Sequence, residues 1–336
     1  MKEHEVIVVG AGISGLLCAE AIQHAGVDAL VIEKSRGVGG RMATRRLESG
    51  RIDHGAQFFT VRDLRFQMIV DRWIEDGLCR TWFVSQGNEL GAQGHVRYCG
   101  NRGMTDPVKG LARSLNVELK TRVESARYED SRWILEAEGH PAYACRDLIL
   151  TAPLPQSLDI LDAGKAGFDS ELEGELRNIR YQKGIALLAV MDGPSGLPGH
   201  GGKKFSDGPI SWMADNQMKG ISPSEPTLTV HSTADFAEAH WNEPIEEAAA
   251  VLKRAAESHL SATLAHWQCH RWRYAFPENP WHELCLHDAP RSLIVAGDAF
   301  GGARVEGAAL SGLQAASEFL HRVGRHQDPA VDGEGY

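Results

Sequence analysis

The first forty residues contain the feature that most restricts the fold, an apolar run that ends in a glycine-rich turn. The run Val6–Val9 is followed by the letters GAGISG, with glycine at positions 10, 12 and 15, and then by a helix-like stretch. A second apolar run begins at Ala29 and ends at the acid Glu33, 18 residues after Gly15. Strand, glycine turn, helix, strand and acid, in this order, are typical of a unit that binds a dinucleotide.

Each part of this motif has a physical reason. Gly10 allows a tight turn, Gly12 lets the backbone approach a pyrophosphate, and Gly15 removes a side chain where the helix packs on the strand. The helix N-terminus at Ser14 offers free N–H groups and the positive end of its dipole to phosphates. Glu33 can accept hydrogen bonds from both hydroxyls of an adenosine ribose, and an acid there disfavours a 2′-phosphate. We therefore expect a tightly bound dinucleotide other than NADP, with an ordinary glycine-rich turn as the alternative.

Composition and charge limit the class of protein. The 336 residues carry a formal net charge of −10 and are 43% hydrophobic, so we expect a globular protein without a basic surface for nucleic acid or an anionic membrane. The six cysteines form no CxxC pair, which argues against a metal site and a disulfide framework. The first strand begins almost at once and no apolar run reaches about 18 residues, so we expect no signal peptide, no membrane span and a cytoplasmic location.

A second group of glycines follows the acid. Lys34 stands directly after Glu33, and Gly39 and Gly40 precede Arg41. A backbone that allows close approach, beside a guanidinium, suits a second contact to a phosphate. This spacing resembles the flavoprotein signature in which an acid and a later Gly-Gly-Arg both bind FAD. A flexible surface loop is the alternative.

Two further segments combine small residues with groups that can contact a flat ligand. The first contains glycine and alanine for backbone approach, two hydrogen-bonding residues and two aromatic rings: Gly55, Ala56, Gln57, Phe58, Phe59 and Thr60. In the second, an apolar strand ends at Gly297 and Asp298, and a helix begins near Glu306 and Gly307. Asp298 can bind a ribityl hydroxyl, and the helix dipole can stabilise negative charge at the pyrimidine edge of a flavin. A kinked buried strand and an ordinary strand–turn–helix are the respective alternatives.

The remaining pattern indicates an α/β chain with two parts: a Rossmann-type domain and a second, α+β substrate domain built on an antiparallel sheet. The apolar run 147–152 predicts a buried parallel strand, and helices are expected near 64–77, 105–115 and 244–264. Further strands are expected at 185–191, 210–214, 228–232 and 266–274. We predict a discontinuous FAD-binding domain of residues 1–62, 103–157 and 290–336, and a substrate domain of residues 63–102 and 158–289.

These motifs, from the glycine turn to Gly297-Asp298, occur in the order of the FAD-dependent amine oxidase superfamily, which the sequence resembles. Within it, the short chain, the segment GAQFFT at 55–60 and the segment HRWRYAFP at 270–277 most resemble the bacterial renalases. The resemblance implies a p-hydroxybenzoate-hydroxylase-like fold, non-covalent FAD, and main-chain contact of Val123 with the adenine. The cofactor contacts that we predict are Gly10, Gly12, Ser14, Gly15, Glu33, Lys34, Gly40, Arg41, Gly55, Ala56, Gln57, Val123, Asp298 and Val305.

The same resemblance implies an activity. Renalases are implied to oxidise the 1,2- and 1,6-dihydro isomers of NAD(P) to NAD(P)+, with hydride transfer to flavin N5 and reoxidation of the flavin by O2 to give H2O2. Such a substrate is already electron-rich, so we expect positioning and no catalytic acid–base pair. The predicted substrate contacts are Gln57, Phe58, Phe59, Thr60, Arg304, Trp212 and His231. Core packing is the alternative for the last two, and a surface position for Arg304.

Two other functions stay open from the residues alone. A flavin-containing amine oxidase would use the aromatic residues as a cage for a neutral amine. A non-catalytic binding protein of the same fold would not need the cofactor contacts Glu33, Arg41 and Asp298. The preference between NAD and NADP isomers and the oligomeric state are also open.

Overall fold

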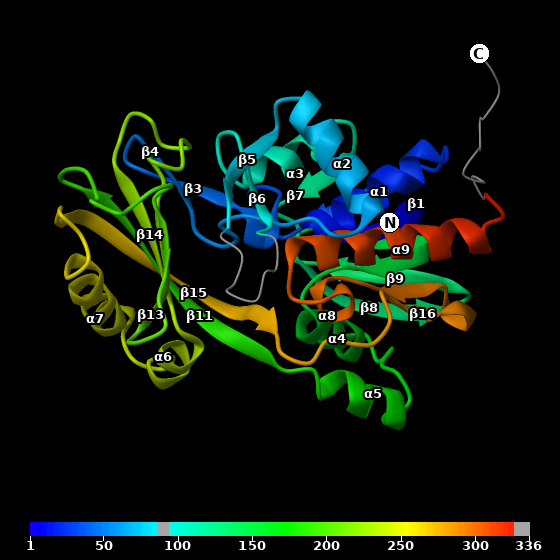
Figure 1. The fold of residues 1–336 in the computed structure, drawn as a ribbon. Coiled ribbons are helices and arrows are strands. Elements are labelled where there is room, and N and C mark those ends of the chain that lie inside the picture. The colour runs from blue at the N-terminus through cyan, green and yellow to red at the C-terminus, as the bar shows by residue number, and fades with distance from the viewer. Residues whose placement is uncertain (86–93, 326–336) are drawn as a thin grey trace, which may run out of the picture.

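Two β-sheets form the frame of the molecule (Figure 1). A computed structural model describes residues 1–85 and 94–325. The eight-stranded sheet has the order β16-β17-β10-β1-β2-β7, and β9 pairs with both β10 and β8. Its strands are β1 (Lys2–Val9), β2 (Ala29–Glu33), β7 (Asn116–Leu119), β8 (Val123–Glu129), β9 (Arg132–Ala137), β10 (Tyr143–Leu150), β16 (Leu286–Asp288) and β17 (Leu293–Val295).

The centre of this sheet is parallel and buried on both faces. β1 runs parallel to β2 and β10, β2 to β7, and β10 to β17. Because side chains alternate along a strand, Val6 and Val8 of β1 pack in one core, and Ile7 and Val9 in the other. This explains the continuous apolar run in the sequence, since strands covered on both faces do not alternate with polar residues.

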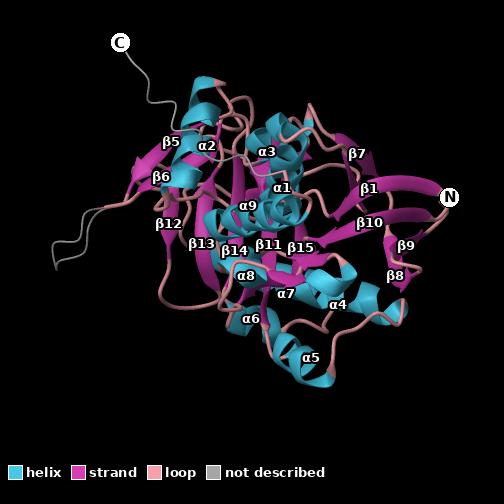
Figure 2. Cartoon of the chain, turned by 90° about the vertical axis from the view of Figure 1, so that its right-hand side faces the viewer, coloured by secondary structure: helices cyan, strands magenta, loops and turns pink. Residues whose placement is uncertain are grey.

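Helices cover both faces of the eight-stranded sheet. The core on one face includes residues of α1 (Ile13–His24), α2 (Leu64–Glu75), α3 (Thr105–Ala112) and α9 (Val305–Arg322). α1 and α9 lie side by side (Figure 2), and a Cβ at Gly312 would overlap the backbone of Ser14. The core on the other face includes residues of α4 (Leu154–Ala163) and α5 (Ser170–Arg177).

The second sheet has five strands in the order β12-β13-β14-β11-β15 and is antiparallel. Ile185 and Leu187 of β11 face a core shared with Leu252, whereas Ala186 and Leu188 pack with Ile52 on the opposite face. We call the part built on the eight-stranded sheet and the part built on the five-stranded sheet the two lobes of the molecule. The two long strands β11 and β15 reach from the second lobe to the first (Figure 1). The elements are β11 (Tyr181–Met191), β12 (Gly202–Lys204), β13 (Ile210–Asp215), β14 (Thr227–Ser232), β15 (Leu264–Pro277), α6 (Ala234–Ala239) and α7 (Ile245–Glu257).

Short elements connect the two lobes. The hairpin of β3 (Thr44–Leu47) and β4 (Gly50–Asp53) packs beside the five-stranded sheet, and β5 (Cys79–Val84) pairs with β6 (Val96–Gly100). A 3-10 turn spans Gly40–Met42, another spans Ala289–Arg291, and α8 (Asp298–Gly301) follows β17. Within residues 1–85 and 94–325, none of the helices has both the length and the apolar character needed to cross a bilayer.

The predicted α/β class, with a Rossmann-like part and a sheet-rich second part, is confirmed. The helix expected at 244–264 is shorter: it spans Ile245–Glu257, and Leu264 belongs to β15. The domain boundaries differ from the prediction, which assigns 63–102 and 158–289 to the substrate domain. Among the described residues, 66–79 and 158–179 supply apolar side chains to the two cores of the nucleotide sheet, and β16 extends that sheet before residue 290. Positions 86–93 and 326–336 of the predicted domains lie outside the described residues.

Candidate functional site

The glycine turn lies at the carboxyl end of β1, where α1 begins. Gly10 has φ +110°, a conformation that favours glycine, and its N–H donates to the carbonyl of Ile32 at 2.8 Å. A Cβ at Gly15 would overlap the carbonyl oxygen of Gly10, whereas a Cβ at Gly12 would meet no heavy atom within 4 Å. Gly15 is therefore required by packing, and Gly12 faces open space.

Glu33 is held at the same edge by backbone donors. Its Oε2 accepts from the N–H of Ala11 and its Oε1 from the N–H of Ser35, both at 2.8 Å. A carboxylate oxygen has two lone pairs, so each oxygen can accept one further hydrogen bond from a ribose hydroxyl. The carbonyl of Glu33 accepts from the N–H of Thr121 at 3.0 Å, which brings Val123, the first residue of β8, to this end of the site.

Lys34 points away from this carboxylate toward α4. Its Nζ donates to Oε1 of Gln156 at 2.6 Å. Burial lowers the pKa of Lys34, and the positive charge of Arg122 acts in the same direction. The predicted contact of Lys34 with the cofactor stays a prediction.

Three predicted segments, around Gly12, Arg41 and Gly55, interlock through their backbones. The N–H of Gly39 donates to the carbonyl of Ala11, and the N–H of Ala56 donates to the carbonyl of Arg41, both at 2.8 Å. A Cβ at Gly55 would overlap that same carbonyl of Arg41, so only glycine fits there. Gly40, which begins the 3-10 turn, lies against Gly12: a Cβ at Gly40 would be 3.8 Å from the Gly12 Cα.

Arg41 and Asp298, which are 257 positions apart, form a bidentate ion pair. The distances are 2.5 Å from Nη1 to Oδ2 and 2.7 Å from Nη2 to Oδ1. The hydroxyl of Tyr181 also donates to Asp298 Oδ1 at 3.2 Å, and Arg41 Nη1 donates to the carbonyl of Tyr274 at 3.2 Å. The predicted phosphate and ribityl contacts therefore meet beside the ends of β11 and β15. Guanidinium has five N–H donors, so this pairing leaves Arg41 able to bind a further oxygen.

The described residues at this edge fit a dinucleotide. α1 has no side-chain cap at its N-terminus, and the Ser14 hydroxyl is buried without a hydrogen-bond partner among the described residues. Free N–H groups, an unsatisfied hydroxyl and open space at Gly12 are the features that a phosphate at a helix N-terminus requires.

Aromatic rings from three segments that are far apart in the sequence come together around Phe58. Phe58, which follows β4, lies 5.5 Å from Trp212 of β13, between ring centroids, and 6.3 Å from both Trp82 and Phe83 of β5. We call these four residues the aromatic cluster. The structure thus brings together two predicted contacts, Phe58 and Trp212. Trp82 and Phe83 are not among the predicted contacts, and their only signal is an aromatic pair in a short strand.

Phe59 lies on the opposite side of the chain from Phe58, as neighbouring residues in extended backbone do. Its N–H and carbonyl pair with Tyr98 at 2.9 Å each. Its ring is 3% exposed, stacks on Tyr98 and contacts Phe66 and Trp73 in the helical core. The predicted substrate contact of Phe59 is therefore corrected to core packing.

Gln57 and Thr60, the two predicted hydrogen-bonding residues, are buried. The Gln57 Nε2 donates to the carbonyls of Asp53 at 2.6 Å and Gly55 at 3.1 Å, which fixes the turn around Gly55. Its Oε1 is buried without a partner among the described residues. The Thr60 hydroxyl accepts from Arg62 Nη1 at 3.3 Å, so Thr60 has a local partner already.

A buried ion pair contacts the backbone of the segment 55–60. Lys219 Nζ donates to Asp53 Oδ2 at 2.6 Å and to the carbonyl of Gln57 at 2.5 Å, and it lies 4.8 Å from the Trp82 ring centroid. The side chains of Lys219 and Asp53 are both fully buried. The sequence gives no sign of this pair, because Lys219 stands in a polar loop 166 positions from Asp53.

Histidines and a tryptophan surround the carbonyl of His54, just before Gly55. It accepts from Trp272 Nε1 at 3.0 Å, and His231 Nε2 lies 3.3 Å from it. Burial, and then the charge of Arg45, lowers the pKa of His54 to about 3 and that of His270 to about 4; burial also lowers the pKa of His231 to about 4. These histidines are neutral at physiological pH. His231 thus supports the predicted segment from the neighbouring strand β14.

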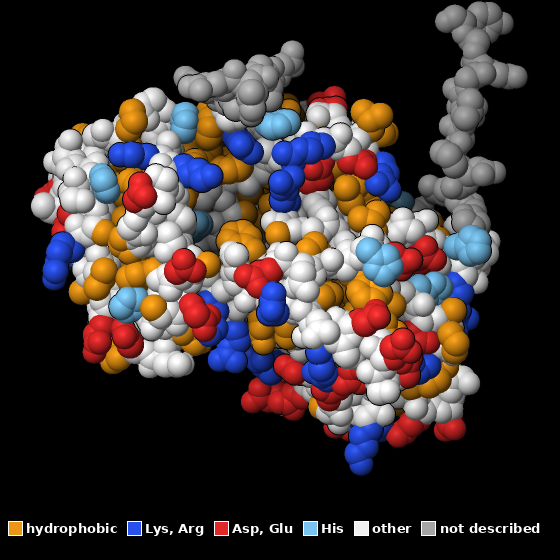
Figure 3. Space-filling model, turned by 60° about the horizontal axis from the view of Figure 1, so that its bottom comes forward, with side chains coloured by type: hydrophobic (Ala, Val, Ile, Leu, Met, Phe, Trp, Pro, Cys, Tyr) orange, Lys and Arg blue, Asp and Glu red, His pale blue; other side chains and the backbone are white. Residues whose placement is uncertain are grey.

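The first turn of α9 is tied to the same region. Glu306 is buried, and its Oε1 accepts from the N–H groups of Arg62 at 2.5 Å and Asp63 at 2.8 Å. Arg304 precedes the helix with an exposed side chain, and Val305 begins it. Seen from below, the molecule is hollowed between its lobes, and basic side chains gather along one rim (Figure 3).

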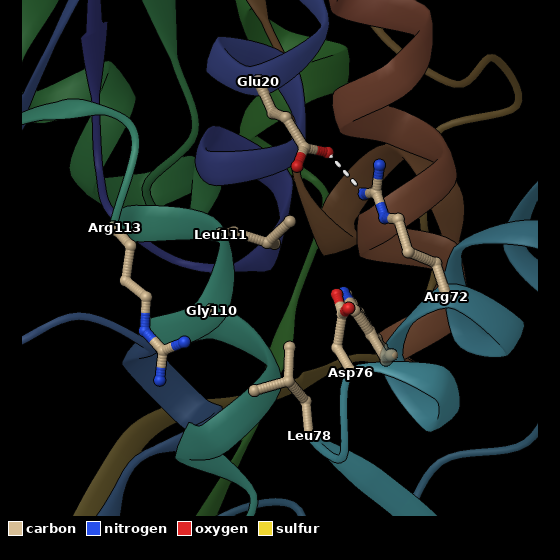
Figure 4. A pocket seen from close by; sticks show the side chains of 8 residues that line it. Glu20, Arg72, Asp76, Leu78, Gly110, Leu111 and Arg113 are labelled. Atoms are coloured by element: carbon tan, nitrogen blue, oxygen red, sulfur yellow. Dashed lines mark hydrogen bonds and ion pairs between the residues drawn. The ribbon is translucent and has the colours of Figure 1, made fainter.

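A separate cavity of about 260 Å³ lies among α1, α2 and α3 (Figure 4). Glu20 and Arg72 form an ion pair of 2.8 Å at its wall, and Asp76 and Arg113 add further charges. Its lining includes no predicted cofactor or substrate contact. We call the part of the site around Gly10, Gly12, Ser14 and Glu33 the glycine edge. The cavity is therefore distinct from the glycine edge.

Comparisons with known proteins agree with this geometry. The model of the NAD(P)-binding Rossmann-like domain matches residues 8–73, and that of flavin containing amine oxidoreductases matches residues 61–320. A stretch of 59 residues is 48% identical to "Possible lysine-specific histone demethylase 1" of Drosophila melanogaster, and one of 62 residues is 36% identical to hydroxyneurosporene desaturase of Rubrivivax gelatinosus. Each stretch is 18% of this chain, but only 7% and 12%, respectively, of those proteins.

Solved structures share the fold over almost the whole chain. A putative protoporphyrinogen oxidase from Exiguobacterium sp. 255-15 superposes with a TM-score of 0.72 at 14% identity, covering 96% of this chain and 99% of that one. A triple mutant of putrescine oxidase superposes with a TM-score of 0.70 at 14% identity, covering 95% and 99%. Because the family model matches most of the chain, and the Rossmann-like match contains the glycine turn and Glu33, this chain belongs to the flavin containing amine oxidoreductase family and has FAD as its cofactor.

Proposed function

We propose that this flavin-dependent oxidoreductase oxidises the 1,2- and 1,6-dihydro isomers of NAD(P) to NAD(P)+ and passes the electrons to O2. The observation that carries the proposal is a contact between the two segments that resemble bacterial renalases. Trp272, in the segment 270–277, donates to the carbonyl of His54 beside the segment 55–60, and the ring centroids of His54 and Trp272 are 5.0 Å apart. Both segments adjoin Arg41, whose guanidinium reaches the carbonyl of Tyr274.

The described residues supply the positioning that this reaction needs. FAD held by residues such as Glu33, Arg41 and Asp298 would supply the acceptor for a hydride equivalent and, with one proton from solvent, the two electrons that reduce O2 to H2O2. Phe58 and Trp212 offer ring faces and edges that can hold a flat nicotinamide. Two of the buried polar atoms without a described partner are Gln57 Oε1, an acceptor, and Trp212 Nε1, a donor. A carboxamide has both complementary groups, so we assign these two atoms to its orientation.

No side chain has to remove a proton from such a donor. Asp53 is neutralised by Lys219, and the histidines at 54, 231 and 270 are held neutral by burial. Catalysis in this proposal is the restriction of the ring to a reactive orientation, which can account for several kcal/mol of barrier lowering, roughly 7–11 in favourable model reactions.

An amine is the second candidate substrate, because the fold is shared with putrescine oxidase and the aromatic cluster could enclose a neutral amine. Rapid anaerobic mixing of the FAD-loaded protein separates the two candidates. We expect borohydride-treated NAD to bleach the oxidised flavin band, and putrescine and benzylamine to leave it unchanged. Bleaching by the amines alone would contradict the proposal.

A substitution in the aromatic cluster tests the role of the rings. Trp212→Leu removes both the ring and the free N–H donor, so we expect slower flavin reduction by the dihydro isomers, by about tenfold or more. Trp267→Leu is the matched control, because Trp267 is 37% exposed on β15 of the same sheet. Equal rates in the two variants would remove Trp212 from the site.

A further inference from the structure

Three arginine side chains, Arg62, Arg97 and Arg304, come together beside the aromatic cluster; we call them the arginine cluster. The guanidinium carbon of Arg97 lies 4.7 Å from the ring centroid of Phe58. Arg62 is joined to the first turn of α9 by its N–H bond to Glu306 and by an ion pair of 3.9 Å, and Arg304 is the residue before that helix. Phe59 pairs with Tyr98, which sets Arg97 beside this loop.

The cluster has more positive charge than its surroundings neutralise. Glu306 is the one carboxylate recorded within 4.0 Å of the three guanidinium groups among the described residues, and it already accepts two backbone N–H bonds. Arg97 is half-buried, and its pKa is lowered by burial and by the charges of Arg62 and Arg304. Arg62 and Arg304 are exposed, so solvent and salt screen part of the repulsion that they exert on the half-buried Arg97. The net charge of the whole chain is −10, so the charge of this cluster is opposite in sign to that of the protein.

A bound anion would relieve this repulsion, and the guanidinium groups favour a phosphate as that anion. Guanidinium groups bind phosphate oxygens with two parallel N–H bonds, and Arg is preferred over Lys where that geometry matters. The same three charges would repel a protonated amine. The neighbouring rings of Phe58 and Trp212 provide the adjoining place for a heteroaromatic ring.

We propose that the arginine cluster binds the phosphate groups of the substrate, so that the enzyme selects phosphorylated dihydronicotinamides over the free ring. This inference rests on the proposed function, and it adds two substrate contacts, Arg62 and Arg97, to the predicted Arg304. The phosphates would lie over the first turn of α9 and β6, while the nicotinamide enters the aromatic cluster. Binding energy at the phosphates then serves to orient the reacting ring.

The test compares two donors that differ in phosphate. For the variant Arg97→Ala/Arg304→Ala, we expect KM for the dihydro-NAD isomers to rise about tenfold or more, with a much smaller change in kcat. KM for N-methyl-1,6-dihydronicotinamide, which has no phosphate, should not change. Arg132→Ala is the control, because Arg132 is an exposed arginine of β9 outside the cluster. Changes within twofold for both donors would overturn the inference.

A binding measurement keeps this test separate from the proposed function. Calorimetry should show that inorganic pyrophosphate binds the wild-type holoprotein and that its affinity falls with added salt. Its affinity for the double variant should be at least about tenfold lower. If neither dihydronicotinamide reduces the flavin, the proposed function fails, and the pyrophosphate result still decides whether the cluster is an anion site. Equal pyrophosphate binding by the wild type and the double variant would overturn the inference, whatever the activity.

Discussion

The two ends of the candidate site are built from different parts of the chain. At the glycine edge, the contacts come from backbone and from residues close in sequence: Gly10, Gly12, Ser14 and Glu33 surround one strand–helix junction. At the aromatic end, side chains from β5, β13 and the loop after β4 meet. The first arrangement is a property of one local unit, whereas the second exists only when two lobes are packed together.

This difference predicts which substitutions affect the whole fold. Residues at the glycine edge can lose cofactor binding while the sheet remains intact, because their task is to leave space and to present N–H groups. Residues behind the aromatic end hold segments of both lobes in place, so their loss should weaken the folded state itself.

The largest effect is expected at the buried ion pair of Lys219 and Asp53. Lys219→Met leaves the Asp53 carboxylate uncompensated at 0% exposure, which should cost about 3–5 kcal/mol in the free energy of unfolding. Urea denaturation measures this loss. Lys183→Met is the control, since Lys183 pairs at 2.8 Å with a Glu238 side chain that is 68% exposed, and such pairs contribute about 0–1 kcal/mol. Similar losses in both variants would show that the buried pair does not join the lobes.

The next effect concerns cofactor affinity at Glu33. Glu33→Ala removes the acceptor for two ribose hydroxyls, and hydrogen bonds to a charged group contribute about 1.5–3 kcal/mol each. We therefore expect the FAD dissociation constant to rise about 100-fold or more. The dissociation constant of Glu33→Gln should lie between those of the wild type and Glu33→Ala. Fluorescence titration of the apoprotein with FAD checks the result, and far-UV circular dichroism checks the fold. Unchanged FAD affinity would refute the ribose role.

Two alanine substitutions separate packing from cofactor space within the same turn. Gly15→Ala places a Cβ against the Gly10 carbonyl and the Thr151 hydroxyl, so the apoprotein should lose about 1–3 kcal/mol of stability. Gly12→Ala meets no protein atom within 4 Å, so the apoprotein should melt within a few degrees of wild type while FAD binding weakens sharply. A destabilised Gly12→Ala apoprotein would show that this space has a structural role instead.

The smallest effect is a pH dependence at the aromatic end. The pKa values of His54 and His231 fall to about 3 and about 4 on folding, chiefly through burial, from 6.5. The unfolded chain therefore binds more protons between these limits, and stability is full above pH 6.5 and is lost as pH falls toward 4. Each histidine contributes at most about 1.4 kcal/mol per pH unit. Urea denaturation at pH 7 and pH 5 should show a smaller difference in His231→Gln than in wild type; an equal difference would contradict the assignment.

The glycine edge was predictable because its signals are local in sequence. Fixed glycine spacing, the acid Glu33 and continuous apolar runs such as Leu148–Leu150 each have one physical explanation, and together they indicated both the parallel sheet and the cofactor. Phe58 and Trp212 were also predicted as contacts, as aromatic residues in extended segments, and their rings lie together in the structure. Which ring faces the site is decided by the pairing of Phe59 with Tyr98, and that tertiary contact made the prediction for Phe59 wrong.

Other features have no local signal. Lys219 is one more lysine in a polar loop until the fold places it against Asp53. The short hairpin Thr44–Asp53 contains three arginines and lacks a clean alternation of polar and apolar residues. The segments of α2, α5 and the part of α4 from Leu158 onward were predicted for the substrate domain, whereas their apolar side chains pack on the nucleotide sheet. An amphipathic helix shows that one face is covered but not which sheet covers it.

Anaerobic titration of the FAD-loaded protein with purified 1,6-dihydro-NAD tests the central claim most directly. The account predicts that the oxidised flavin band disappears in proportion to the added donor, that NAD+ appears in the same amount, and that admitting O2 restores the band with release of H2O2. A flavin that stays oxidised in the presence of excess 1,6-dihydro-NAD, but is reduced by putrescine or benzylamine, would contradict it.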